Sequence, residues 1–362
     1  MPRPRPIRTD RKWTCTSMRA SSTPSPWGAG PMREITLSKA VNEAIAEEMR
    51  RDGRVFLMGE DVAEAGTPFK VLSGLVEEFG TERVIDTPIS EPGFMGIALG
   101  AAMTGMRPIV DLMFGDFLYL IMDQLCNQAA KTYYMSGGKL NAPLVLRTNL
   151  GATRRSAAQH SQSLHALVAH IPGLKVALPS SAYEAKGLLK TAIRDDNPVV
   201  IFEDKLMYQD KAPVPEEEFL IPFGEANVLR EGRDVTMVAT SSMVQVCLKA
   251  AETLAKEGIS AEVIDPRTIV PLDERTIVDS VRKTSRAIVV DEGHQSFGVT
   301  AEIAARITEK AFYHLDAPVA RLGAMDVPVP FSPALEDLTV PTPEKVAEAA
   351  RRQLRREMLH AA

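Results

Sequence analysis

Short apolar runs alternate with segments of helical periodicity along most of the chain that follows residue 31. An apolar side chain recurs every three or four positions from Leu37 to Met49, which predicts a helix, and Ser38 is placed to cap its start. Further along the first half, strands are predicted at 55–58, 108–113, 143–147, 175–178 and 198–202, and helices near 73–79, 117–134, 162–170 and 182–194. Such alternation predicts a mainly parallel sheet with helices on both faces.

The periodicity lapses between residues 205 and 223, which contain three prolines and three consecutive glutamates. This composition predicts a linker. A second series follows, with strands predicted at 235–240, 261–264 and 287–290 and helices near 243–256, 274–282, 299–307 and 343–355. The pattern therefore predicts an α/β protein with two open, mainly parallel sheets and flanking helices, divided into domains at 32–204 and 224–362.

Composition and charge narrow the class of protein. The chain has 362 residues, 45% of them hydrophobic and 25% charged, which is typical of a globular protein large enough for two domains. A net charge of -5 gives no electrostatic reason to expect nucleic acid or an anionic membrane as a partner, and no apolar run is long enough to span a membrane. The three cysteines, Cys15, Cys126 and Cys247, are far apart, which suggests neither a zinc site nor a disulfide framework and favours a reducing compartment.

The first 31 residues differ from the rest because they are rich in Arg, Pro, Ser and Thr and contain Asp10 as their only acid. Without an apolar core they do not form a secretory signal. An acid-poor leader of this kind resembles an organellar transit peptide, although its prolines would break an amphipathic helix. The simpler interpretation, which we favour, is that the natural start is Met32 and that residues 1–31 are an upstream artefact or a disordered tail. The expected location is the cytoplasm, or the mitochondrial matrix if residues 1–31 are a transit peptide.

The stretch 86–106, DTPISEPGFMGIALGAAMTGM, places a single carboxylate, Glu91, between a proline-containing turn and an apolar segment that predicts a buried helix. Gly96 and Gly100 give this helix a face of small residues on which another element can pack closely. Glu91 has two interpretations. It can complement the dipole of the helix that it begins, or it can carry chemistry, and the local pattern alone favours the first.

The segment 151–163, GATRRSAAQHSQS, follows a predicted strand, and loops at the carboxyl ends of parallel strands are where open α/β sheets place ligands. His160 lies in it among hydrogen-bonding residues, either as an acid/base group or as a loop residue held by its neighbours. His165 and His170 follow at intervals of five, which turn a helix by about 500°, so the three histidines do not share a face as a metal site would need. We expect these two to be packing or helix-end residues.

Two absences exclude other classes of enzyme. The chain has no GxGxxG fingerprint and no Walker loop, so a dinucleotide or nucleoside triphosphate site is unsupported. The sequence GHQSFG around Ser296 has one residue too many before the serine for the GxSxG turn of α/β hydrolases.

Several long motifs occur in an order that is specific for one family. They are MREITLSKAVNEAI, MGEDV, RVIDTPISE, DQLCNQAAKTYYMSGG, AAQHSQS, IPGLKV, AIRDDNPVV and EDKLMY in the first half, and DPRTIVPLD and VVDEGHQSFGV in the second. Together they resemble the β subunit of the E1 component of 2-oxo acid dehydrogenase complexes. The resemblance covers essentially everything after Met32. It implies a pyrimidine-binding domain for thiamine diphosphate at 32–204, a linker at 205–223 and a transketolase C-terminal domain at 224–362.

The resemblance also implies a reaction and its catalytic residues. Glu91 corresponds to the acid that hydrogen-bonds the aminopyrimidine of thiamine diphosphate and favours the tautomer that takes a proton from the thiazolium carbon. Phe117 corresponds to an aromatic that lines the pyrimidine ring, although a core aromatic is an equal alternative. His160 corresponds to a histidine that binds substrate or serves acyl transfer to lipoamide. The expected activity is oxidative decarboxylation of pyruvate or another 2-oxo acid, with acyl transfer to a lipoyl-bearing E2 partner.

Metal sites and a partner subunit follow from the same resemblance. A structural potassium ion is expected, largely through backbone oxygens, at Leu144, Ala192, Ile193, Asp195 and Asn197. The GDG motif and later Asn that hold magnesium and the diphosphate of thiamine enzymes are missing. The resemblance therefore implies an α subunit that holds the magnesium, in an assembly of two α and two β chains with thiamine diphosphate at each interface.

Some features leave alternatives open. Arg154 and Arg155 depart from the smaller or uncharged residues of pyruvate-type subunits, and LHALVAHIPGLKV also resembles the β subunit of acetoin dehydrogenase. Acetoin is therefore the main alternative to pyruvate as substrate. Two further alternatives are a non-catalytic scaffold that pairs with an α subunit and docks E2, and a thiamine enzyme that needs no partner.

Overall fold

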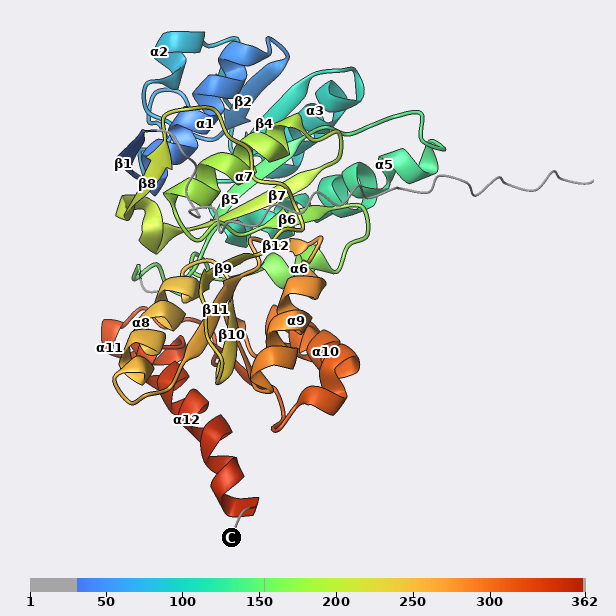
Figure 1. Ribbon diagram of the computed structural model, residues 1–362. Coiled ribbons are helices and arrows are strands. Elements are labelled where there is room, and N and C mark those ends of the chain that lie inside the picture. Colours follow the sequence, from blue (N-terminus) through green and yellow to red (C-terminus); the bar gives the residue numbers. More distant parts are fainter. Residues whose placement is uncertain (1–30, 153, 361–362) are drawn as a thin grey trace, which may run out of the picture.

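Two mainly parallel sheets, one in each half of the chain, form the framework of the structure (Figure 1). The computed structural model describes residues 31–152 and 154–360. The predicted leader lies outside the described residues except for Pro31. Both sheets carry helices on their two faces, so the α/β class with two open, mainly parallel sheets is confirmed. None of the described helices is long and apolar enough to cross a membrane.

The first sheet has seven strands in the order β12-β6-β7-β5-β4-β2-β3, and only β12 runs antiparallel to its neighbour. Its central strands are buried along their whole length because helices cover both faces, which explains why they read as continuous apolar runs. The strands of this sheet are β2 (Val55–Gly59), β3 (Val84–Asp86), β4 (Arg107–Asp111), β5 (Val145–Leu150), β6 (Lys175–Ala177), β7 (Val199–Asp204) and β12 (Thr268–Val270).

The helices of the first half include regular and irregular segments. The α-helices are α1 (Leu37–Arg51), α2 (Leu75–Phe79), α3 (Glu91–Met103), α4 (Leu118–Met122), α5 (Ala130–Met135), α6 (His165–Ala169) and α7 (Ala182–Arg194). The single helix predicted at 117–134 is divided into a 3-10 turn η1 (Gly115–Phe117), α4, a π-helical segment η2 (Asp123–Ala129) and α5. The predicted cap of the first helix is also wrong, because Thr36 accepts the hydrogen bond from the Lys39 backbone N–H at 3.2 Å.

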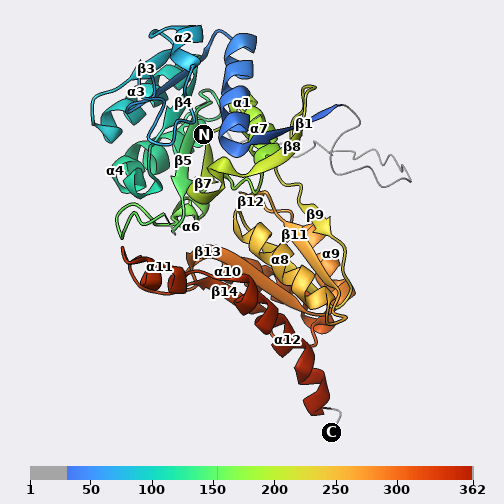
Figure 2. The same cartoon turned by 90° about the vertical axis from the view of Figure 1, so that its left-hand side faces the viewer.

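The second sheet has five strands in the order β14-β13-β10-β11-β9, with β9 antiparallel (Figure 2). The first part of helix α12 packs in the cluster formed by this sheet and α8, and the helix then continues beyond the sheet (Figure 1). The elements of this half are β9 (Asn227–Arg230), β10 (Val235–Ala239), α8 (Met243–Ala255), β11 (Ala261–Asp265), α9 (Glu274–Thr284), β13 (Ala287–His294), α10 (Val299–Ala311), η4 (Phe312–His314), β14 (Ala320–Ala324), α11 (Pro333–Thr339) and α12 (Pro343–His360).

The connection between the halves is more structured than its composition predicts. Residues 205–215 form the 3-10 helix η3 (Lys205–Gln209) and strand β8 (Lys211–Pro215), which pairs antiparallel with β1 (Met32–Thr36). Strand β12 returns from the second half to pair with β6 of the first sheet. One strand of the second half therefore belongs to the sheet of the first half. The division into two domains by a linker at 205–223 stays a prediction.

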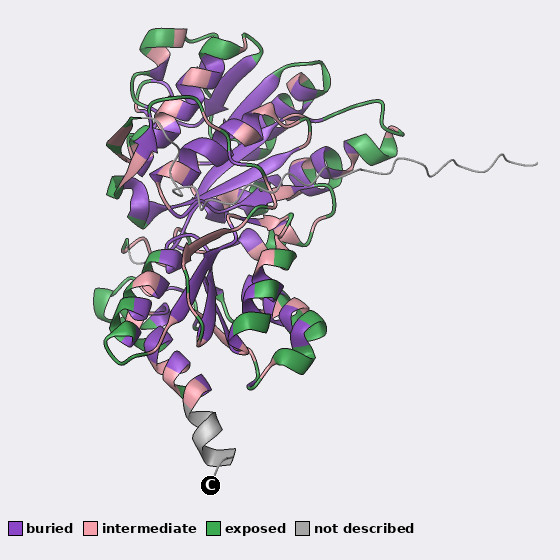
Figure 3. Ribbon diagram, viewed as in Figure 1, coloured by how far each residue is buried: buried purple, intermediate pink, exposed green. Residues whose placement is uncertain are grey.

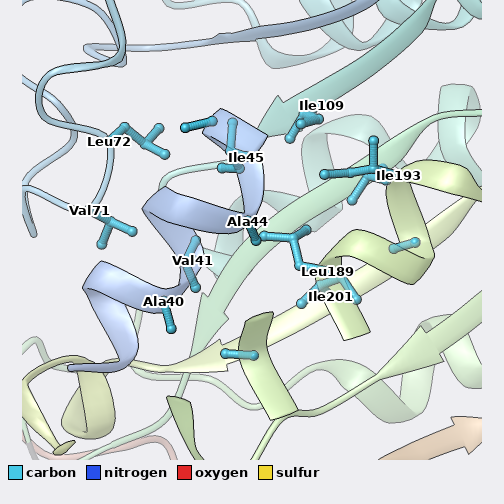
Figure 4. Close-up of a cluster of buried hydrophobic side chains, with 14 of the residues drawn as sticks. Ala40, Val41, Ala44, Ile45, Val71, Leu72, Ile109, Leu189, Ile193 and Ile201 are labelled. Atoms are coloured by element: carbon cyan, nitrogen blue, oxygen red, sulfur yellow. The ribbon is translucent and has the colours of Figure 1, made fainter. Parts of the chain in front are cut away.

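The strands of the first sheet are buried (Figure 3), and their alternate side chains belong to two separate apolar clusters, one on each face. On one face, Leu57 and Ile109 belong to the cluster that α1 and α7 cover. The small side chains of Ala40 and Ala44 lie in α1, and Ile193 of α7 belongs to the same cluster (Figure 4). On the other face, Met58, Val110 and Leu146 pack against α3 and the segments that follow β4. This second core supports the loops at the carboxyl ends of the strands.

Candidate active site

The residues predicted to carry chemistry follow neighbouring strands of the first sheet. Phe117 follows β4, His160 follows β5 and Glu91 begins the helix after β3. Since β5, β4, β2 and β3 are adjacent and parallel, their carboxyl ends meet at one edge of the sheet. The fold therefore brings all three to the edge where open α/β sheets bind ligands.

Glu91 is the first residue of α3 and is only 7% exposed. Its carboxylate makes no hydrogen bond or ion pair with the described residues, although it lies in the first turn where the helix dipole favours an acid. Glu60, directly after β2, is a second buried acid at the same place, and its Oε1 atom has no hydrogen-bond partner. Burial, with the charges of Glu91 and Asp61, raises the pKa of Glu60. The dipole of α3 explains an acid at position 91, but it does not explain the second buried acid, Glu60.

Aromatic rings surround His160. Its ring lies edge-on to Phe114, with centroids 4.7 Å apart, and to Phe117, with centroids 5.5 Å apart. Gly115 makes this arrangement possible, because a Cβ atom there would lie 2.3 Å from the carbonyl oxygen of Asn149 at the end of β5. The loop after β4 can thus rest directly on β5, with its two phenylalanines against the histidine.

A buried lysine supports the same loop from below. Lys205, which follows β7, is fully buried, and its Nζ donates a hydrogen bond to the backbone carbonyl of His160. The ammonium also lies 5.6 Å from the centre of the Phe114 ring. Burial lowers the pKa of Lys205 despite the negative charge of Asp116 and other acids. Asp116 in turn accepts hydrogen bonds from the backbone and side chain of Gln162, at 3.2 and 2.8 Å.

The other two histidines of this region have structural positions. His165 begins α6, is 1% exposed, and places Nε2 2.9 Å from Oδ2 of Asp291, which lies within β13. It therefore joins the two halves of the chain. His170 is exposed at the C-terminal end of α6. Within residues 31–152 and 154–360, no three His, Cys, Asp or Glu side chains lie together as metal ligands would.

The residues predicted for potassium lie together where α7 ends and β5 and β7 begin, but most of their oxygens already accept hydrogen bonds. The carbonyls of Leu144 and Ala192 accept from Val199 N and Asp195 N at 3.0 and 3.1 Å. The Arg107 guanidinium donates to the carbonyls of Ile193 and Asp195, both at 2.9 Å, and Asn197 donates to the Asp195 carboxylate. A potassium ion here would use the second lone pairs of these carbonyls beside a fixed cation.

Comparison with known proteins identifies the family. The transketolase pyrimidine-binding domain model matches residues 33–211, and the transketolase C-terminal domain model matches residues 224–346. The chain is 50% identical to the β subunit of acetoin:2,6-dichlorophenolindophenol oxidoreductase of Bacillus subtilis, covering 87% of this chain and 95% of that protein. It is 50% identical to the pyruvate dehydrogenase E1 component subunit β of Rickettsia felis, covering 88% and 98%. The chain belongs to the family of E1 β subunits.

Other comparisons agree with this assignment. The mitochondrial pyruvate dehydrogenase E1 component subunit β-1 of Arabidopsis thaliana is 49% identical, with 90% of each chain covered. A solved structure described as the inactive β4 tetramer of a split-gene transketolase has a TM-score of 0.73 over 88% of this chain and 98% of that chain. At 24% identity it shows a shared fold.

The surface of this E1 β chain beside the candidate site is unusually apolar. Large apolar side chains of α3, α4 and α5 and the turn before α3 are at least half exposed, namely Ile89, Ile97, Tyr119, Leu120, Tyr133, Tyr134 and Met135. A Cβ atom added at Gly96 or Gly100 would meet nothing within 4 Å, so the small-residue face of α3 is open in the single chain. Two surface hollows, of about 740 and 600 Å³, lie elsewhere, beside β14 and beside α6.

Three residues of the site were not predicted from the sequence. Glu60 and Lys205 directly follow the observed strands β2 and β7, and they lie two and three residues after the strands predicted at 55–58 and 198–202, so their position at the sheet edge was a signal that the motif search did not use. Phe114 lies three residues before Phe117 and makes the closer ring contact with His160. The burial of these side chains depends on packing between distant segments, which a local pattern does not contain.

Proposed function

We propose that this chain is the β subunit of a thiamine-diphosphate-dependent E1 component that acts with an α subunit on pyruvate or a related 2-oxo acid. The acyl group would pass to a lipoyl-bearing E2 partner. The observation that carries the proposal is the pair of buried acids, Glu60 and Glu91, at the carboxyl edge of the first sheet. Glu60 Oε1 is buried without a hydrogen-bond partner, and the Glu91 carboxylate makes no hydrogen bond with the described residues, which fits a polar ligand that is held there.

The residues at this edge fit the aminopyrimidine end of thiamine diphosphate. The Glu91 carboxylate would hold a ring nitrogen and control its proton, and Glu60 would share the low-dielectric environment that makes this control effective. Phe117 and Phe114 would supply apolar surface for the ring. The bound cofactor supplies the carbon nucleophile and the electron sink, while His160, held between the two rings, would receive or orient the substrate or the lipoyl group.

The diphosphate end of the cofactor requires a second chain in this proposal. The sequence lacks the GDG motif, so magnesium would be held by an α subunit. The exposed apolar side chains of α3, α4 and α5 lie on the helix that Glu91 begins and on the segments after β4, and their aromatic and aliphatic composition is typical of a protein interface. An assembly of two α and two β chains, with cofactor sites at α–β contacts, accounts for both features.

Acetoin is the second candidate substrate, because a relative at 50% identity is named as an acetoin-oxidising enzyme. The test is turnover by the reconstituted α–β complex with pyruvate, a branched-chain 2-oxo acid and acetoin, each with thiamine diphosphate and magnesium. We expect the highest kcat/KM for pyruvate. Preference for acetoin over every 2-oxo acid would replace the first candidate by the second, and absence of all three activities would favour a non-catalytic scaffold.

Two further parts of the proposal are potassium and location. A potassium ion at Leu144, Ala192, Ile193, Asp195 and Asn197 would stabilise the end of α7, provided that it shares the carbonyls with Arg107. Plant relatives are named as mitochondrial. For this chain we propose the cytoplasm, or the mitochondrial matrix if residues 1–31 act as a transit peptide.

A further inference from the structure

The loop that carries His160 is supported by the second half of the chain. Its first residues pack against the segment 329–340, where Ala152, Val329 and Val340 form a small apolar cluster, each less than 10% exposed. The backbone N–H of Ala152 also donates a hydrogen bond of 2.6 Å to Oε1 of Glu292, which lies within β13. His160 of the first domain thus belongs to a loop that is held by contacts with the second domain.

Arg155 makes the strongest of these contacts. Its NH1 atom lies 2.6 Å from Glu336 Oε2 and 2.7 Å from Asp337 Oδ1, and its backbone N–H also donates to Glu336, at 3.2 Å. Both acids belong to α11. Glu336 is fully buried whereas Arg155 is about one-third exposed, so Arg155 neutralises a carboxylate that water does not reach. We call Arg155, Glu336 and Asp337 the interdomain clamp.

The clamp is connected to His160 through a short path. Arg155 and Ala157 both have positive φ, 58° and 60°, a conformation that non-glycine residues keep only where their surroundings hold them. On the other side of the loop, Arg154 donates to the carbonyl of Lys205 at 2.5 Å, and Lys205 donates to the carbonyl of His160. The loop is therefore fixed on one side by α11 and on the other by the residue that follows β7.

We propose that Arg155, Glu336 and Asp337 are positioning residues that set the His160 loop for catalysis from the opposite domain. They do not contact the reacting atoms. Their effect is exerted through His160, because loss of the clamp frees the loop between Ala152 and His160 and lets the imidazole leave its place between Phe114 and Phe117. The catalytic part of this proposal rests on the proposed function, whereas the ordering of the loop does not.

The first test measures the loop itself in the reconstituted α–β complex. Arg155→Ala should increase hydrogen–deuterium exchange across 151–163 by about tenfold or more, because removal of the clamp allows local opening at low free energy. Arg351→Ala is the matched control, since Arg351 makes a similar two-bond ion pair with Glu257, at 2.6 and 2.9 Å, far from this loop. Unchanged exchange in the Arg155 variant would overturn the proposal.

The second test measures whether Arg155 acts through His160. We expect Arg155→Ala to lower kcat by about 10-fold to 100-fold with little change in the KM for pyruvate, and Arg155→Lys, which keeps the positive charge but lacks the planar fork of the guanidinium, to recover part of the loss. In a His160→Ala background the same substitution should cause no further loss of kcat. Losses that multiply in the double variant would show that Arg155 does not work through His160.

The two tests also separate this inference from the proposed function. If the unmodified complex has no activity on pyruvate, a branched-chain 2-oxo acid or acetoin, the proposed function fails. The exchange experiment still decides the clamp. If the unmodified complex is active and its loop is equally protected in both arginine variants, the clamp fails while the proposed function stands.

Discussion

Arg147 is a buried cation close to the candidate site, and its removal should lower the free energy of unfolding. It is 3% exposed, and its Nε and NH2 atoms donate to Glu203 at 2.8 and 2.6 Å while NH1 bonds Asp111. Asp111 also accepts from the backbone N–H of Met113, which begins the loop that carries Phe114. Arg147→Met would leave two buried carboxylates without their cation, a change that typically costs about 3–5 kcal/mol.

The cost of Arg147→Met should depend on pH. Burial already raises the pKa of Glu203 although Arg147 opposes the shift. Without the guanidinium, the folded-state pKa of Glu203 rises further above its unfolded value, so the variant loses stability as pH rises through this interval. Urea denaturation followed by circular dichroism at pH 5.5 and pH 8 would show that the variant loses more free energy of unfolding, relative to the unmodified protein, at the higher pH.

The control for this prediction is Arg50→Met. Arg50 forms a two-bond ion pair with Glu78, but the two side chains are 56% and 41% exposed, so its loss should cost less than about 1 kcal/mol. The reasoning would be refuted if Arg147→Met lowered the free energy of unfolding no more than Arg50→Met does. It would also be refuted if the loss caused by Arg147→Met were the same at both pH values.

Three other predictions concern binding of the cofactor, the buried carboxyl group of Asp265 and the potassium ion. Calorimetric titration of the purified chain with thiamine diphosphate and magnesium should show no binding, whereas the α–β complex should bind; binding by the chain alone would favour a self-sufficient enzyme. Burial and the charge of Glu184 raise the pKa of Asp265 to about 7, so ionisation should destabilise the fold as pH rises from about 4 to 7, and Asp265→Asn should be less sensitive to pH over this range in thermal unfolding. Equal melting curves for Asp265→Asn and the unmodified chain at every pH would contradict this. Replacement of potassium by choline at constant ionic strength should lower the melting temperature of the complex, and an unchanged temperature would exclude a structural potassium ion.

The sheets were predictable because their strands are short apolar runs between helical patterns. The runs 55–58 and 198–202 lie within or largely within β2 and β7, and the predicted helix 182–194 is α7. Strands β8 and β12 were missed because each pairs with a strand far away in the sequence; β8 also contains two prolines, and β12 has only three residues. The break of the helix predicted at 117–134 was missed because its π-helical part lies within an uninterrupted run of helix-compatible residues.

The candidate site was predictable in position but not in its supporting residues. Glu91 and His160 lie at one edge because parallel strands place their carboxyl ends together, which the alternation of elements already implied. The proximity of Glu60 to Glu91 and the burial of Lys205 below His160 depend on packing between separate segments. The sequence showed that Arg155 differs from the smaller or uncharged residues of pyruvate-type subunits. It did not show the contact with Glu336, because the two residues are 181 positions apart.

The most direct test of the proposed chemistry is Glu91→Gln in the reconstituted α–β complex with thiamine diphosphate and magnesium. The amide keeps the size of the carboxylate and removes its charge and its capacity as a base. We predict a fall in kcat of about 10²-fold to 10⁴-fold on the preferred substrate, with the assembly of two α and two β chains unchanged by sedimentation. Activity within about threefold of the unmodified complex would contradict the assignment of Glu91 as the activating acid and would leave only its role at the start of α3.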